Sequence, residues 1–276
     1  MNNKILLSLS LLSLGLLHAC GGGGGGGTAA PLALPPAGAA PPAAQPPATA
    51  DSGAVSASFA RGERARYQLF GVGSQSFGVL SQSEQAASGA MTRLNDVTLT
   101  GASTTKEING DANFAIGRWV AGTVTRSSGA EILTGVDNRA YHYAALNELK
   151  ALPETGSTTC DAGVFTRPTY VGGGSGIAAN SGDASGSATL AFGSEGGIVT
   201  GALKVKVGDA TGTVNFDTRV KTPSSTAISG AVLSGGAGAA IMLGDHGAQA
   251  YAIAVGYAAT LPSGARYVGI TKFRCA

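Results

Sequence analysis

The feature that most constrains the fold is a succession of short alternating segments, separated by glycine-rich turns, that fills the chain after residue 153. Lysine and valine alternate over 204–207, which is the pattern of a strand with one buried and one exposed face. We predict eight strands, at 156–161, 185–192, 198–207, 212–219, 226–233, 239–243, 250–258 and 265–275. Because the hairpins are evenly spaced and no crossover helix separates them, the pattern predicts an up-and-down eight-stranded β-barrel over 154–276.

The preceding region, 55–153, predicts a second β-rich unit, an N-terminal subdomain. A hairpin is predicted over 67–79, with its turn at Gly71-Val72-Gly73, and alternating segments that predict strands lie at 91–100 and 113–125. A short helix is predicted near 144–152, because leucine recurs at every third position and Pro153 ends the run. The predicted fold class is therefore all-β and antiparallel, with this subdomain followed by the barrel.

Residues 1–19 predict the signal peptide of a lipoprotein. Lys4 is followed by an apolar run over 5–17, which is shorter than the roughly 20 residues that a membrane-spanning helix needs. Leu17-His18-Ala19-Cys20 then resembles the lipobox of bacterial lipoproteins, in which the chain is cut before the cysteine and lipid is attached to it. The alternative is plain secretion with a coincidental cysteine, but the glycine run after Cys20 favours lipidation.

A Gly/Pro/Ala tether is predicted over 20–54. Residues 21–27 are all glycine, and 28–50 hold seven of the eleven prolines in the chain. Neither composition can bury a core, so we expect a disordered spacer. By resemblance to Gram-negative lipoproteins, Gly21 in the place of aspartate favours the outer membrane, at the cell surface or on its periplasmic face.

The two remaining cysteines predict a disulfide. Cys160 and Cys275 lie on the first and last predicted strands of the barrel, which become neighbours when a barrel closes. An exported chain meets an oxidising compartment, where such a pair forms a bond. The alternative is two free thiols. The disulfide would fasten the closing seam.

The layout resembles the transferrin-binding-protein-B-like surface lipoproteins of Gram-negative bacteria, which Slam translocators export. Cys20 with its glycine tail, the glycine-rich β region and the eight-strand pattern carry the resemblance, although the cysteine pair departs from the family. Four local segments are also similar to the related domains: GRWVAG at 117–122, YHY at 141–143, LPETG at 152–156 and GSATLAF at 186–192. The resemblance implies a surface-facing binding module without catalysis. Members of the family bind transferrin, complement regulators, haemoglobin or haem through different loops.

Candidate ligand-binding residues are Trp119, Tyr141, His142 and Tyr143. A haem site wants histidine beside aromatic side chains, and His142 lies between two tyrosines, facing away from both in a strand. His246, in a predicted hairpin turn, is the other histidine considered for such a site, and His142 is the better candidate. The alternatives are a surface histidine, a solvated turn and a tryptophan in the core, and we favour these.

Several functions have no support in the sequence. A net charge of +2 with 12% charged residues gives no field that implies nucleic acid. No metal-ligand spacing, nucleophile elbow or phosphate-binding loop occurs, and the carboxylates are scattered. LPETG matches the sortase signal but lacks the hydrophobic segment and basic tail that must follow it. We expect neither catalysis nor a cofactor, haem being the one exception considered.

The sequence thus predicts an outer-membrane lipoprotein that presents a β-rich binding module to a host or environmental ligand. Two alternatives stay open: a haem or small-ligand carrier, and a structural envelope lipoprotein without a soluble ligand.

Overall fold

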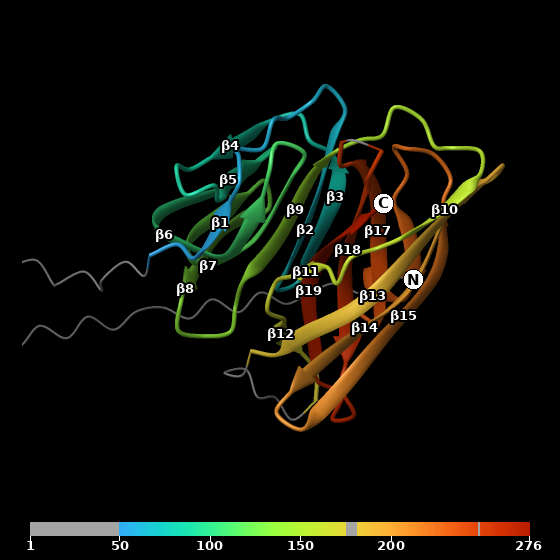
Figure 1. Ribbon diagram of the computed structural model, residues 1–276. Helices are drawn as coiled ribbons and strands as arrows, with labels where there is room; N and C mark the ends of the chain where they lie inside the picture. Colours follow the sequence, from blue (N-terminus) through green and yellow to red (C-terminus); the bar gives the residue numbers. More distant parts are fainter. Residues whose placement is uncertain (1–49, 175–180, 248) are drawn as a thin grey trace, which may run out of the picture. The chain divides into compact units, whose positions relative to one another are not determined.

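The computed structural model describes residues 50–174, 181–247 and 249–276 (Figure 1). The predicted signal peptide, Cys20 and nearly all of the tether lie outside these residues. Within them, strands form three sheets, and a single 3-10 turn, η1 (Val232–Ser234), is the only helical element. The pairings are antiparallel, except that β1 (Gly53–Val55) pairs in parallel with β6 (Val97–Gly110). The predicted all-β antiparallel class is confirmed.

The first sheet has nine strands and curls into a half-barrel. Its order is β3 (Ser74–Val79), β2 (Ala65–Gly71), β9 (Tyr141–Asn147), β7 (Phe114–Arg126), β6, β5 (Met91–Leu94) and β4 (Ser83–Gln85), with β8 (Gly129–Thr134) on β7 and β1 on β6. Trp119 on β7 donates its indole N–H to the Met91 carbonyl on β5 at 2.6 Å. The Met91 N–H donates in turn to the Tyr143 hydroxyl on β9 at 3.1 Å. Strands two and three places apart in the sheet therefore meet across its concave face, around one apolar core.

The helix predicted near 144–152 is wrong. β9 runs to Asn147 in extended conformation, and 148–152 are irregular. β9 lies between β2 and β7 and pairs with both along its length. Those two ladders, together with burial of both faces, outweigh a leucine spacing that spans only two turns of helix.

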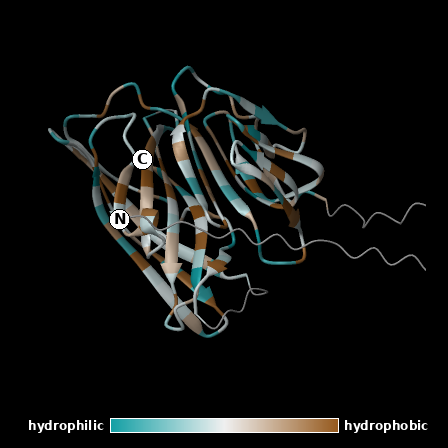
Figure 2. Cartoon of the chain, turned by 180° about the vertical axis from the view of Figure 1, so that it is seen from behind, coloured by the Kyte–Doolittle hydropathy of each residue, from teal (hydrophilic) through white to brown (hydrophobic). Residues whose placement is uncertain are grey.

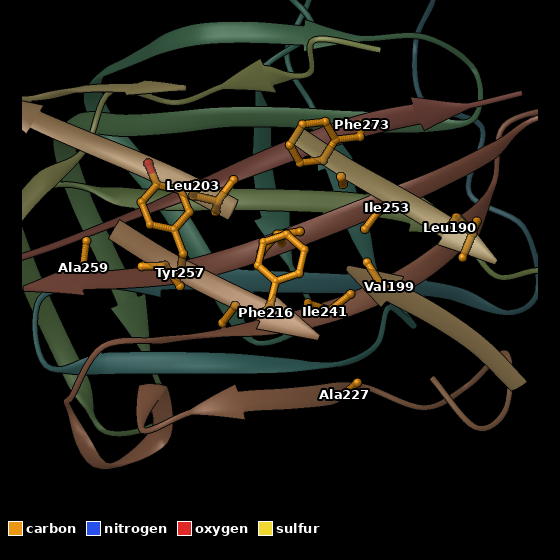
Figure 3. Close-up of a cluster of buried hydrophobic side chains, with 14 of the residues drawn as sticks. Leu190, Val199, Leu203, Phe216, Ala227, Ile241, Ile253, Tyr257, Ala259 and Phe273 are labelled. Carbon is orange, nitrogen blue, oxygen red and sulfur yellow. The ribbon is translucent and has the colours of Figure 1, made fainter. Parts of the chain in front are cut away.

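The other two sheets face each other across a second core. The four-stranded sheet has the order β10 (Gly156–Thr159), β13 (Asp183–Gly193), β14 (Gly196–Val207) and β15 (Ala210–Val220). The six-stranded sheet has the order β11 (Val164–Phe165), β19 (Arg266–Cys275), β18 (Tyr251–Thr260), β17 (Gly238–Asp245) and β16 (Ala227–Gly230), with β12 (Thr169–Gly172) also on β19. Leu203 and Phe216 from one sheet meet Ile253, Tyr257 and Phe273 from the other (Figure 3). Hydrophobic and hydrophilic residues alternate along β14 and β15 as predicted (Figure 2).

A strand occurs in each of the eight predicted segments, but the predicted closed eight-stranded barrel is not what they form. No ladder joins β15 to β16 in the described residues. β16 has only four residues, because a turn containing Pro223 precedes it and η1 follows shortly after it. β15 instead crosses the six-stranded sheet and contacts β16, β17 and β18. The result is two facing sheets that stay open along this side.

The opposite side is fastened by the predicted disulfide. Cys160 and Cys275 are directly opposed in an isolated bridge, and their sulfur atoms are bonded. From this point the chain follows β19 through β11 and β12, so one irregular strand pairs first with β13 and then with β19. The disulfide therefore lies where the two sheets exchange this strand.

A third apolar core joins the half-barrel to the outer face of the six-stranded sheet. Phe70, Ile116 and Leu146 from β2, β7 and β9 pack against Met242 and Ile270. The contact is close: a Cβ on Gly256 would lie 2.2 Å from the Phe70 ring, so only glycine fits there.

Replacing Cys160 and Cys275 together by serine is expected to lower the free energy of unfolding by about 2–5 kcal/mol, because the bond closes a long loop in the unfolded chain. Guanidinium denaturation followed by far-UV circular dichroism measures the change. Reduction of the unaltered protein provides the matched control and should give the same loss. An unchanged midpoint in both would show that packing alone holds the sheets together.

Candidate functional site

Trp119, Tyr141 and Tyr143 lie inside the half-barrel, each fully buried. Tyr141 donates its hydroxyl to Glu131, and burial raises the pKa of both tyrosines well above the ordinary value. The Trp119 and Tyr143 rings are tilted against each other with centroids 5.7 Å apart. Their polar atoms are satisfied by the protein, so these side chains build the concave core and no ligand reaches them in this conformation.

His142 points from the opposite face of β9, as predicted, but the favoured interpretation as a surface histidine is wrong, because the side chain is fully buried. Its Nδ1 lies 2.8 Å from the Thr166 hydroxyl, and its Nε2 contacts the Thr169 hydroxyl. The Thr166 hydroxyl donates to the Ile270 carbonyl and accepts from the Ile270 N–H, both at 3.0 Å. Since its single proton is used there, Thr166 must accept from Nδ1–H, and Nε2 must accept from Thr169.

This arrangement fixes His142 as the neutral Nδ1–H tautomer. Burial lowers its pKa well below 6.5, and the charge of Arg118 lowers it further. Both ring nitrogens are occupied, so ligation of a haem iron by His142 would require the threonine contact of the ligating nitrogen to break. Thr166 and Thr169 belong to the segment that runs along β19. His142 therefore connects the half-barrel to the six-stranded sheet by hydrogen bonds.

His246 has a different set of neighbours. Its ring packs edge-on against Phe114 with centroids 5.3 Å apart, and Nδ1 lies 3.9 Å from an Asp111 carboxylate oxygen. Lys272 places its ammonium group 4.1 Å from the centre of the Phe114 ring. Burial lowers the pKa of His246 and so does Lys272, whereas Asp111 raises it. The structure does not bring His246 together with His142 and the two tyrosines.

The described parts of the chain contain neither a metal-ligand cluster nor a membrane-spanning helix. No group of three or more histidine, cysteine, aspartate or glutamate side chains is placed to hold a metal ion there. None of the described helical segments has the length and apolar character to cross a membrane.

Two surface cavities were not anticipated from the sequence. One, of about 420 Å³, is lined by Arg64, Lys150, Lys221 and residues 152–154 among others. The second, of about 310 Å³, lies between the β2–β3 hairpin, the turn after η1 and the ends of β18 and β19. We call this second cavity the Arg266 groove, and its lining residues are Gly71, Gly73, Ser74, Gln75, Val171, Leu233, Gly235, Ala258, Arg266 and Val268. They come from separate segments of the chain, so no spacing within one segment could reveal it.

No protein-family model, curated protein or solved structure matches this chain. The structure itself defines the class as an all-β antiparallel protein with a curled half-barrel sheet and a disulfide.

The buried neutral histidine predicts a pH-dependent stability. The unfolded chain binds a proton on His142 near pH 6.5, but the folded chain does so only at much lower pH. The free energy of unfolding should therefore fall as pH drops below about 6.5, with a slope from this group approaching about 1.4 kcal/mol per pH unit. Urea denaturation at a series of pH values measures it.

The variant His142→Asn identifies the group, because an asparagine amide N–H replaces Nδ1–H but does not titrate. It should lower stability at neutral pH by about 1–3 kcal/mol and flatten the slope between pH 6.5 and 5. The variant His246→Asn measures the part contributed by the other histidine. A slope that His142→Asn leaves unaltered would contradict the assignment of a neutral, buried His142.

Proposed function

We propose that the chain is a lipid-anchored outer-membrane protein whose β-rich body binds a host or environmental ligand without catalysis. The observation that carries the proposal is the sequence Leu17-His18-Ala19-Cys20, followed by glycine and proline-rich residues as far as the first strand. The resemblance to transferrin-binding-protein-B-like lipoproteins supports display at the cell surface.

The entry of the chain into the folded body is consistent with a tethered module. Asp51 accepts hydrogen bonds from the Thr105 N–H at 2.7 Å and from the Ser88 hydroxyl at 2.6 Å. β1 follows immediately and pairs with β6. A tether that begins at Cys20 would thus end in a hydrogen-bonded strand of the half-barrel. The hydrogen bonds of β1 and Asp51 would resist a force applied along the tether.

The body has the rigidity that a binding platform needs. Three cores, a disulfide and the His142 contacts hold its sheets together. Among its exposed apolar side chains, Ile132 on β8 and Val136 in the following loop are 72% and 90% exposed. Both side chains would lose water-exposed apolar area if a partner covered this loop, which would favour binding. We therefore include the loop after β8 in the proposed ligand-binding surface.

The variant Cys20→Ser tests the anchor. It should abolish incorporation of labelled palmitate and move the protein from the membrane fraction to the soluble fraction. Cys160→Ser is the matched control, since it removes a different cysteine and should leave the lipid label in place. Unchanged membrane association of Cys20→Ser would contradict lipid anchoring.

Protease treatment of intact cells tests the side of the membrane. Surface display predicts that the protein is lost from unbroken cells while a periplasmic marker survives. Full protection until the outer membrane is permeabilised would place the body in the periplasm and make capture of a host protein untenable.

A further inference from the structure

The Arg266 groove combines an apolar floor with one fixed positive charge. Ala258 and Val268 are buried at its base, and Val171 is half-buried beside them. Leu233 forms part of the edge and is 57% exposed. The volume of about 310 Å³ lies at the lower end of the sizes of small-molecule pockets, about 300–1,000 Å³. The lining therefore suits a small ligand with an apolar body.

Arg266 is one of four arginines in the described chain that have no carboxylate within 4 Å, and the others are Arg61, Arg66 and Arg274. Seven arginines lie within 4 Å of a carboxylate: Arg64, Arg93, Arg118, Arg126, Arg139, Arg167 and Arg219. Arg266 is partly buried, yet within the residues described it has no acidic partner at this distance. A partly desolvated guanidinium without a counter-ion is costly, and it pairs best with a planar carboxylate.

The guanidinium is also held in place. Nη1 donates to the Gly235 carbonyl in the turn after η1. Gly235 adopts a left-handed conformation with a φ of 81°, which favours glycine at this turn. Because one nitrogen is engaged by this carbonyl, donors remain for a ligand in the groove.

We propose that the Arg266 groove binds a small amphipathic carboxylate, with its alkyl part on Ala258 and Val268 and its carboxylate on Arg266. The Gln75 amide donates to the Val232 carbonyl at 2.8 Å and so fixes the β2–β3 hairpin as the facing wall. This inference rests on the proposed binding role and names a ligand class for it. It does not depend on where the lipoprotein is displayed.

Octanoate is the probe, titrated against the full lipoprotein in nanodiscs and followed by ligand-observed NMR, with empty nanodiscs subtracted. Saturable binding is expected for octanoate, and at least tenfold weaker binding for octanol and octylamine, which lack the carboxylate. Absence of saturable binding up to about 10 mM, or equal binding of octanol, would overturn the proposal.

Two variants locate the binding site. Arg266→Gln should weaken octanoate binding at least tenfold, whereas Arg274→Gln, which changes an exposed arginine on the same strand, should not. Leu233→Asp changes an exposed residue, so folding should be retained, and it should also weaken binding at least tenfold by adding a negative charge beside the groove. Octanoate binding that both Arg266→Gln and Leu233→Asp leave unchanged would overturn the assignment.

Failure of this experiment is distinguishable from failure of the proposed function. Lipid attachment and protease access are measured on cells without octanoate, so their results are independent of whether the groove binds a ligand. A groove that binds octanoate in a protein found to face the periplasm would support a small-ligand carrier there.

Discussion

Phe70 of the half-barrel lies directly against the backbone at Gly256 of the six-stranded sheet, so the two sheets pack face to face around a shared apolar core. Neither element could bury its outward face alone, because β2, β7 and β9 carry apolar residues on both faces. The half-barrel covers its own concave core, but its convex face needs a partner. The six-stranded sheet is apolar on both faces, so it also needs two partners. One face packs on the four-stranded sheet and the other on β2, β7 and β9. The interface between them is therefore a condition for folding.

Polar groups lie beside this apolar contact and give it direction. Arg66 donates to the Thr226 hydroxyl at 2.8 Å, and Gln68 donates to the Ala240 carbonyl at 2.9 Å. His142 meets Thr166 and Thr169. Apolar contacts tolerate sliding, whereas a buried hydrogen bond is lost when its partner shifts by about an ångström. These side chains therefore fix how the two layers are placed on each other, at the cost of some unmet hydrogen-bonding capacity: Arg66 Nε and Gln68 Oε1 have no partner among the described residues.

The sequence was a good guide to strands because period-2 alternation is a local property. It located a strand in every predicted segment of 154–276 and placed Cys160 opposite Cys275. It failed where the outcome depends on neighbours. Barrel closure depends on whether β15 pairs with β16, and no ladder joins these two strands in the described residues. The leucine pattern at 146–152 predicted a helix that does not form. The two ladders that hold β9 as a strand involve β2 and β7, and the sequence of this segment alone does not show them.

The same distinction explains the candidate sites. Alternation correctly put Tyr141 and Tyr143 on one face of β9 and His142 on the other, but it could not show that both faces are covered. The Arg266 groove is assembled from distant segments that have no shared motif. Residues with conspicuous chemistry, tryptophan, tyrosine and histidine, turned out to build the body because large side chains and paired polar groups are what a glycine-rich sheet needs to pack. The surface features that we propose for binding are a partly buried arginine without a carboxylate and a few exposed aliphatic residues. In such a chain a charged group that lines a surface cavity and lacks a counter-ion points to a ligand better than residue type does.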